Sequence, residues 1–441
     1  MPLSARVAPL PGGAAQAERL GPVGGALRAQ LAQAEPELQA FYRARGWRPL
    51  WIRGWGLRDD AQAVVQAVSG AAADGLDPDR YGAPGLGEVL AQASSQQPSD
   101  LARAEIALSR AAAGYLSDLH APAPGATMIY ADPALAPPTP DRLGVLKALA
   151  TWPHPADGVA RLSRMNPIYR QLRDALAAWK AKEAGEEAAA AERLIRTNLE
   201  RARLLPPDLG QRYILVDAAA QTLWLYQDGQ AVDSMKVVVG KPSEPTPMMA
   251  GLVRYAVARP YWNVPPDLVA NSIAPKVLRL GPAWLEAQDM EILSDWTPNA
   301  RLLTPQEVDW RAVAGGRTVL RVRQRPGPHN MMGQVKFIFP NSVGVYLHDS
   351  PLRQYFAQSR RTESAGCVRL SDAPRLARWL LSERAGELSQ PGAPETRIDL
   401  AAPVPVYIVY FTALPNGDDL DRRPDIYRRD PPLEARLARR A

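Results

Sequence analysis

Residues Tyr213–Val239 read YILVDAAAQTLWLYQDGQAVDSMKVVV, and they mark a change from helix-forming to strand-forming sequence. The runs Tyr213–Asp217 and Thr222–Tyr226 are short and rich in β-branched and aromatic residues, as is typical of strands. Asp228-Gly229 is a strong signal for a tight hairpin turn, and Ala231–Val239 supplies a third strand after it. The pattern predicts an antiparallel meander at the start of a β-rich domain.

Further strand-like runs lie downstream, and we expect them to complete the same sheet. They are Tyr255–Pro260, Val335–Phe339, Val343–Leu347 and Val404–Phe411. A proline-rich, partly helical segment from Trp262 to Pro328 interrupts them and is too long for an ordinary loop, so we interpret residues 262–328 as an inserted cap or lid. Its tryptophans Trp284, Trp296 and Trp310 have no obvious core of their own, and we expect them to pack over the mouth of the sheet.

The chain before the meander has a helical pattern. Apolar residues recur at spacings of three and four between Leu101 and Leu119, which defines one helix face. Tyr169–Leu205 reads as one continuous helix that ends before two prolines. We therefore expect an α+β protein. Its predicted parts are a flexible leader (1–37), a helical domain (38–205), a mostly β domain (206–417) with the inserted cap, and a charged C-terminal tail (418–441).

Composition excludes several classes of protein. Of 441 residues, 46% are hydrophobic and 22% are charged, which is ordinary for a globular protein. A net charge of +6 is too small for a concentrated nucleic-acid-binding surface, so we expect no nucleic-acid partner. No run approaches the ~20 apolar residues of a membrane-spanning helix, and no signal peptide is visible. The single cysteine can form neither an intrachain disulfide nor a thiolate metal cluster.

The strongest chemical signal is the pair His348 and Cys367. His348 ends a predicted strand, and the loop before Cys367 can return the chain so that thiol and imidazole lie side by side, as nucleophilic catalysis requires. We expect the histidine, together with Arg361 or Arg369, to lower the pKa of the thiol. Gly366 gives the backbone room to aim its N–H and that of Cys367 at one point, as an oxyanion hole does.

An alternative reading is purely structural. Cys367 would then be a small buried hydrophobe and His348 a hydrogen-bonded core histidine, as residues of these types often are. The glycine before the cysteine and the strand-end position of the histidine favour catalysis. His120 and His329 lack any partner pattern, and we interpret both as structural.

These residues resemble a known enzyme family. Tyr346–His348 and Ser364-Ala-Gly-Cys-Val-Arg369 are similar to the active-site motif of YkuD-type L,D-transpeptidases. Flanking segments resemble the large Gram-negative, YcbB-like class, which carries a helical scaffold domain. These segments are Phe41–Trp51, Gly75–Pro78, Thr246–Met249, Pro260–Pro265, Gly333–Pro340 and Asp425–Tyr427. The resemblance therefore implies a helical scaffold domain followed by a mostly β L,D-transpeptidase catalytic domain with an inserted cap.

The resemblance also implies roles for individual residues. Cys367 would be the nucleophile and His348 the general base, while Asp349 would orient the imidazole through either its carbonyl or its side chain. Gly366 and Cys367 would form the oxyanion hole. Many family members carry a second histidine where Ala365 stands here, which removes one group that could relay a proton.

Other residues would contact substrate by the same resemblance. Ser364 and Arg369 would shape the donor site, and Tyr346, Trp262 and Asn263 would line the substrate groove. For Tyr346 and Trp262, plain aromatic packing is an equally open alternative.

The implied reaction joins two peptidoglycan stem peptides, one as donor and one as acceptor, in a 3→3 crosslink. It proceeds through a cysteine thioester, needs no metal or cofactor, and would take place in the periplasm. With the same chemistry the acceptor could be water, a free D-amino acid or a protein amine. A different reading is a non-catalytic protein that only binds wall peptide.

Overall fold

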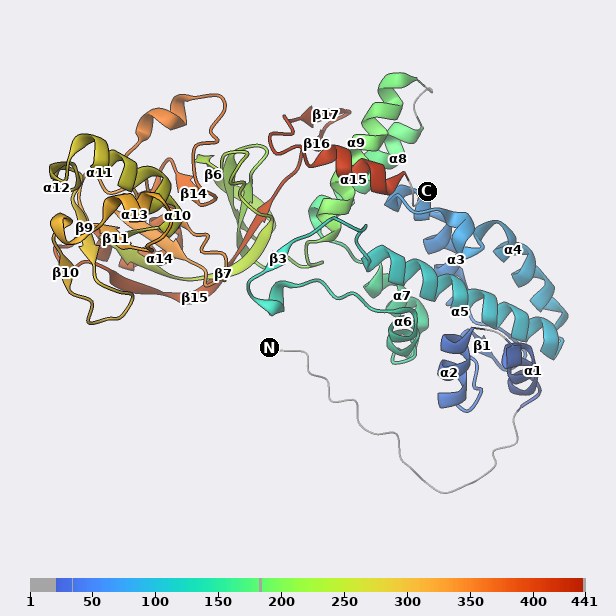
Figure 1. Cartoon of the computed structure of the whole chain (residues 1–441). Coiled ribbons are helices and arrows are strands. Elements are labelled where there is room, and N and C mark those ends of the chain that lie inside the picture. Colours follow the sequence, from blue (N-terminus) through green and yellow to red (C-terminus); the bar gives the residue numbers. More distant parts are fainter. Residues whose placement is uncertain (1–20, 34, 182–184, 439–441) are drawn as a thin grey trace. The chain divides into compact units, whose positions relative to one another are not determined.

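The computed structural model describes residues 21–33, 35–181 and 185–438, which fall into two compact units (Figure 1). The helical unit contains the described residues up to Thr127, then Ala134–Leu209 and the chain from Phe411 onward. The β unit contains Met128–Pro133 and Gly210–Tyr410. The predicted α+β class, with a helical N-terminal part and a β-rich part after it, is confirmed.

The helical unit is built around its longest helix, α5. Its helices are α1 (Pro22–Gln30), α2 (Pro36–Ala44), α3 (Ala61–Ser69), α4 (Ala83–Gln92), α5 (Pro98–His120), α6 (Arg142–Leu149), α7 (Pro155–Leu162), α8 (Pro167–Lys180), α9 (Glu186–Arg203) and α15 (Asp430–Leu437). Two short hairpins join them, β1 (Ile52–Arg53) with β2 (Gly56–Leu57) and β16 (Ala413–Asn416) with β17 (Asp419–Arg422). Helices α1, α3, α4 and α6 pack against α5. The predicted apolar face between Leu101 and Leu119 is buried, as expected.

The structure differs from the predicted leader over residues 1–37. Residues 1–20 lie outside the described residues, but Pro22–Gln30 form α1. Pro22 stands in the first turn, where its missing N–H has no cost, and Leu27 and Leu31 are fully buried. Burial of these side chains explains why the segment is a helix that packs on α5 rather than a leader.

The predicted continuous helix over Tyr169–Leu205 is two helices, α8 and α9, which pack against each other. Gly185 has an extended backbone and starts α9, and two glutamates in the first turn complement the helix dipole. Lys180 near the end of α8 lies 3.8 Å from Glu192 of α9. The Ala/Glu-rich composition gave no sign of this break, because every residue type in it favours helix except the glycine.

The predicted charged tail is also folded as far as the structure describes it. It pairs β17 with β16 and adds α15, which packs on α9. The buried Arg201 of α9 lies 2.7 Å from Asp430 of α15, and Asn198 donates to the hydroxyl of Thr412 at 3.0 Å. These buried polar contacts fix the end of the chain to the helical unit, whereas an unstructured tail would leave them unmade.

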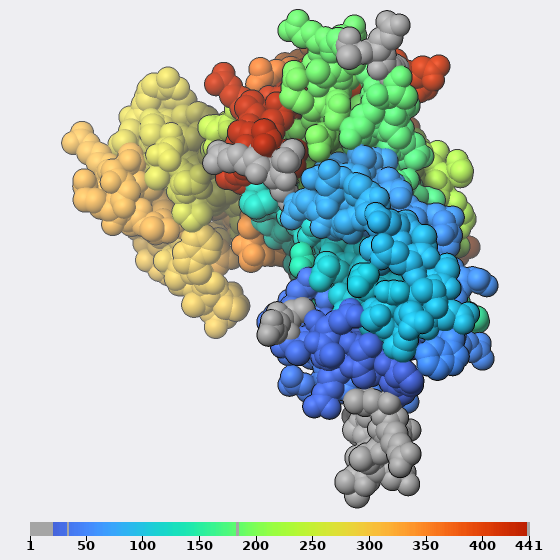
Figure 2. Space-filling view, turned by 90° about the vertical axis from the view of Figure 1, so that its right-hand side faces the viewer, coloured from blue at the N-terminus to red at the C-terminus, as the bar shows by residue number. Residues whose placement is uncertain are grey.

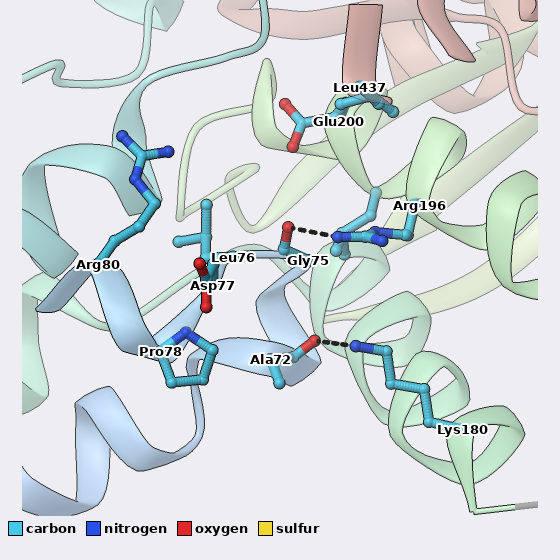
Figure 3. Close-up of a pocket in the computed structure, with 11 residues that line it drawn as sticks. Ala72, Gly75, Leu76, Asp77, Pro78, Arg80, Lys180, Arg196, Glu200 and Leu437 are labelled. Atoms are coloured by element: carbon cyan, nitrogen blue, oxygen red, sulfur yellow. Dashed lines mark hydrogen bonds between the residues drawn. The ribbon is translucent and has the colours of Figure 1, made fainter. Parts of the chain in front are cut away.

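One quoted segment of the helical half, Gly75–Pro78, has a structural explanation. Gly75 adopts the left-handed conformation (φ 71°), and the side chain of Asp77 caps the short 3₁₀ turn that Pro78 begins. The segment borders a cleft of about 250 Å³, shown in Figure 3. Lys180 and Arg196 point to it, but they donate to the carbonyls of Ala72 and Gly75 and so serve the fold.

The β unit is a ring of strands. The strands are β3 (Ile129–Tyr130), β4 (Arg212–Asp217), β5 (Thr222–Gln227), β6 (Gln230–Val238), β7 (Met249–Ala258), β12 (Val335–Ile338), β13 (Leu347–His348), β14 (Val368–Leu370) and β15 (Thr396–Val409). Their order is β12-β13-β14-β6-β5-β4-β15-β7-β3, and β12 also pairs with β7, which closes the sheet. The predicted meander is β4-β5-β6, with Asp228 and Gly229 in the turn between β5 and β6.

The inserted segment forms a subdomain with its own sheet. Its elements are β8 (Trp262–Val264), α10 (Pro266–Leu268), α11 (Ala274–Leu280), α12 (Ala283–Ala287), β9 (Met290–Leu293), β10 (Leu302–Leu303), α13 (Trp310–Ala314) and β11 (Arg321–Gln324). The strands pair in the order β10-β9-β11-β8. Trp310 is buried in the subdomain's own core, Trp284 packs against that core, and Trp296 is 57% exposed. The prediction that these tryptophans have no core of their own is therefore wrong, since Trp310 and Trp284 pack within the inserted subdomain and not only against the closed sheet.

The base of the inserted subdomain is held by Asn330, which is almost fully buried. Its side-chain amide donates to the carbonyls of Pro260, where the insert begins, and of Gln324 and Arg325, where it ends. The amide of Gln324 in turn donates to the carbonyls of Gln288 and His329. The two connecting chains are thus tied to each other. Among the described residues, no helix is long and apolar enough to cross a membrane.

Candidate active site

Two parallel strands bring the predicted site residues together. Strands β13 and β14 pair in register, with His348 opposite Arg369. Tyr346 immediately precedes β13, and Cys367 immediately precedes β14. If the alternation of side chains extends one residue beyond each strand, Tyr346, His348, Cys367 and Arg369 share a face. The rings of Tyr346 and His348 meet edge to face at 5.8 Å between centroids. The sequence prediction that the two strand ends lie side by side is confirmed.

The imidazole of His348 is oriented by a backbone carbonyl. Its Nδ1 lies 2.6 Å from the carbonyl oxygen of Asp349, and since a carbonyl only accepts, Nδ1 carries the proton. The Asp349 carboxylate faces elsewhere and accepts from Arg353 at 2.8 Å and from the backbone N–H of Gln334 at 3.0 Å. Of the two alternatives left open by the sequence, the structure selects the carbonyl. This tautomer leaves Nε2 as the nitrogen that can accept a proton.

Burial keeps His348 neutral. Loss of hydration, followed by the positive charges of Arg369 and Lys336, lowers the pKa of His348 to about 3, while the bond to the Asp349 carbonyl opposes the shift. At neutral pH the side chain is therefore an unprotonated base.

We predict that Asp349→Asn separates stability from chemistry. Because the carbonyl holds the imidazole, the variant should retain acylation of the thiol within about threefold, far from the loss expected for a general base. It should lose about 1–3 kcal/mol in the free energy of unfolding, since the amide cannot satisfy both Arg353 and the Gln334 N–H. Urea denaturation and acylation kinetics measure the two effects. A loss of acylation by two decades in folded protein would show that the carboxylate is needed.

The thiol of Cys367 is half-buried, and its Sγ lies 3.5 Å from the carbonyl oxygen of Gly344. Burial raises the pKa of Cys367, and hydrogen bonds from Tyr346 and the charge of Arg369 oppose this only in part. The expectation that the pKa of the Cys367 thiol is lowered is therefore wrong, because loss of hydration of the thiolate outweighs the effect of the nearby cation. Arg361 does not contribute, since its guanidinium donates to the carbonyls of Val237 and Gln221.

A tight turn positions the cysteine. Gly366 adopts φ 101°, which only glycine tolerates readily. The Ser364 hydroxyl donates to the Cys367 carbonyl at 2.5 Å and accepts from the Gly366 N–H at 3.2 Å, while Thr246 donates to the Gly366 carbonyl at 2.8 Å. The Gly366 N–H is therefore occupied, and of the predicted oxyanion pair the Cys367 N–H is the remaining candidate. Ser364 shapes the turn itself.

Arg369 offers an unused donor. Its Nε is buried and has no hydrogen-bond partner among the described residues, and its guanidinium carbon lies 6.0 Å from the ring centre of Tyr355. A buried, unsatisfied donor beside a candidate nucleophile is typical of a site that binds a polar substrate group.

Trp262 and Asn263 belong to a different sheet. They lie on β8 of the inserted subdomain, where Asn263 is exposed and pairs in register with Arg323. Trp262 packs against the subdomain core. Their predicted substrate contacts stay a prediction, and for Trp262 the packing alternative has direct support.

Sequence reasoning missed an ion pair beside the histidine. Lys336 on β12 pairs in register with His348, and its Nζ lies 3.1 Å from Glu395. Glu395 also accepts from the N–H of Tyr261, where the inserted subdomain begins. Lys336 stands within the quoted segment Gly333–Pro340, but nothing in the sequence near Glu395 indicates the pair.

Family models match both halves of this chain. Residues 211–408 match the family model of the L,D-transpeptidase catalytic domain, named YkuD, and residues 36–176 match a model described as a scaffold domain. A Haemophilus influenzae protein named "Putative L,D-transpeptidase" is 26% identical over 411 residues, which are 90% of this chain and 79% of that protein. Residues 211–408 therefore form a YkuD L,D-transpeptidase catalytic domain, and residues 36–176 form a scaffold domain.

Solved structures of L,D-transpeptidases match over smaller parts. An L,D-transpeptidase from Mycobacterium smegmatis has 16% identity and a TM-score of 0.21 over 45% of this chain and 58% of that chain. A mutant L,D-transpeptidase of Enterococcus faecium has 12% identity and a TM-score of 0.22 over 51% of this chain and 64% of that chain. This chain thus spans less than two thirds of each.

Proposed function

We propose that this protein is a peptidoglycan L,D-transpeptidase that forms 3→3 crosslinks through a thioester on Cys367. One observation carries the proposal. The in-register pairing of β13 with β14 puts His348 opposite Arg369, two residues after Cys367, and the Asp349 carbonyl holds Nδ1, which supports Nε2 as the base. This is the arrangement of nucleophile, base and orienting group that covalent acyl transfer uses.

In the first half-reaction, a tetrapeptide stem is the donor. His348 Nε2 accepts the thiol proton as Sγ of Cys367 attacks the carbonyl of the third stem residue. The tetrahedral intermediate collapses when the imidazolium gives that proton to the departing amine of the terminal D-alanine. Because the thiol and imidazole are both neutral at rest, proton transfer accompanies attack, and the cation of Arg369 favours the thiolate that develops.

In the second half-reaction, a side-chain amine of a neighbouring stem attacks the thioester. His348 takes a proton from the amine, the C–S bond breaks, and the proton passes to the sulfur, so the free thiol and neutral imidazole are restored. The net change is exchange of one amide for another, and no electron is transferred. Water would divert the thioester to hydrolysis, so the site must exclude it until the amine arrives.

We further propose that residues 262–328 act as a substrate cap. The subdomain has its own core, and Asn330 ties its two connections together, which favours movement as one body about its base. Hydrogen exchange tests this. Slower exchange across 262–328 when a stem peptide is bound supports a cap, and unchanged exchange with the site occupied argues against one.

The alternative acceptors keep the same thioester and differ in the second step. Incubation with purified peptidoglycan, followed by digestion and mass spectrometry of the muropeptides, separates them. Crosslinked dimers support transpeptidation, tripeptides alone indicate a carboxypeptidase, and substituted tetrapeptides indicate amino-acid exchange. Action on cell-wall peptide implies that the protein works in the periplasm, and fractionation of cells tests that location.

A further inference from the structure

The helical unit carries a pocket that the Cys367 chemistry does not use. Its volume is about 480 Å³, within the range of small-molecule sites. Glycines, prolines, two tryptophans and an arginine line it, namely Gly21–Gly24, Gly46–Pro49, Ile52, Gly54 and Trp55. The segment that holds these residues, coloured dark blue in Figure 2, forms part of the surface of the helical unit.

Neither tryptophan of the pocket is fully buried. Trp55 lies in the two-residue turn between β1 and β2, and 51% of its surface is exposed. Trp47 has φ 61°, a left-handed conformation that is uncommon for a bulky residue. The indole of Trp55 is therefore partly free to contact a ligand in the adjoining pocket.

A buried carboxylate fixes the loop that follows Trp47. Glu105 of α5 has no exposed surface, and it accepts hydrogen bonds from the N–H groups of Leu50 (2.5 Å) and Trp51 (2.9 Å) and from the hydroxyl of Tyr42 (2.6 Å). Burying a carboxylate is costly, and burial raises the pKa of Glu105. The loop is therefore held in one shape before any ligand arrives, which lowers the cost of binding.

The rim of the pocket also offers polar groups. Arg45 and Arg48 donate to each other's carbonyls, at 3.3 and 3.0 Å, through their Nε atoms. Arg48 is exposed and lines the pocket. A Cβ added at Gly21, Gly46 or Gly54 would meet nothing within 4 Å, so the backbone at the rim is accessible to a ligand.

We propose that this pocket binds the glycan strand of peptidoglycan, with Trp47 and Trp55 as platforms for sugar rings. A sugar ring has an apolar face of C–H groups, which packs on an indole, and edge hydroxyls, which need donors and acceptors. The tryptophans supply the first, and Arg48 with the open glycine backbone supplies the second. The inference rests on the proposed function, in which the substrate is a glycopeptide polymer. A site for the glycan on the scaffold domain would retain the polymer while the β unit acts on its peptides.

Isothermal titration of the full chain with an N-acetylglucosamine tetrasaccharide tests the inference. We expect binding by the wild type and a rise in Kd of at least about tenfold in Trp55→Ala, as for truncation of an aromatic anchor. Trp55→Phe keeps an aromatic face and should lose less. The matched control is Trp296→Ala, which removes a tryptophan of similar exposure (57%) in the inserted subdomain and should bind as the wild type does.

Thermal melts of each variant confirm that the fold is intact. Absence of tetrasaccharide binding at millimolar concentration would overturn the inference, as would equal affinity in wild type and Trp55→Ala. Binding of a polyproline peptide to the pocket when the tetrasaccharide does not bind would also overturn the inference, since proline rings pack on tryptophan too. Titration does not involve Cys367, so any of these failures leaves the proposed transpeptidase chemistry untouched.

Discussion

Replacement of Cys367 by alanine should abolish every covalent step of the enzyme. The chain has one cysteine, so no second thiol can replace it. A carbapenem is a strained acyl donor that should leave one thioester adduct on the wild type. We expect intact-mass spectrometry to show that adduct and to show none in Cys367→Ala. Crosslinking of peptidoglycan should fall by more than about four decades, as expected when a nucleophile is removed.

A second variant, Cys367→Ser, separates loss of the thiol from loss of the fold. Cys367→Ser keeps nearly the same volume and the hydrogen bonds of the turn through Ser364, so it should melt close to the wild type. It should still lose acylation, because a neutral hydroxyl is a much weaker nucleophile than a thiolate. A carbapenem adduct that persists in Cys367→Ala would place the acylated residue elsewhere and remove the basis of the mechanism.

The sequence predicted the three-stranded meander because the composition of its strands and of its turn is distinctive. β-Branched and aromatic residues identify β4 and β5, and Asp228-Gly229 identifies the turn that leads into β6. It failed where order depends on distant contacts. The helix α1 is stable because Leu27 and Leu31 are buried, and nothing within residues 21–33 reveals their partners. The strands of the inserted subdomain are two to four residues long, too short to show a period.

The sequence predicted that His348 and Cys367 lie near each other, but it did not predict the electrostatics around them. The spacing and residue types around His348 and Cys367 indicated a pair, and the register puts His348 opposite Arg369, two residues after Cys367. The direction of the thiol pKa depends on how much water the fold removes, which no local motif records. Likewise, the Gly366 N–H is taken by Ser364, a contact decided by the shape of the turn. The sequence thus identifies the thiol and the imidazole as candidates, but their protonation states depend on burial.

Loss of His348 should change both the rate of acylation and its pH dependence. In the wild type the imidazole stays neutral down to a pKa of about 3, so acylation by a carbapenem should not fall as the pH drops from 8 to 5. His348→Ala should acylate about two to four decades more slowly at neutral pH. What remains requires spontaneous ionisation of a thiol whose pKa burial has raised, so its rate should increase about tenfold per pH unit over the same range.

Stopped-flow or mass-spectrometric rates from pH 5 to 8 measure both effects in the same samples. The control is a substitution of His329, whose carbonyl rather than its ring makes the contact with Gln324, so His329→Ala should leave rate and pH profile unchanged. The slope is the sharper criterion, because a variant with a damaged site becomes slow without becoming dependent on thiol ionisation. A His348→Ala enzyme that is slow but has a flat profile would mean that another group takes the thiol proton, and a near wild-type rate would remove His348 from the reaction altogether.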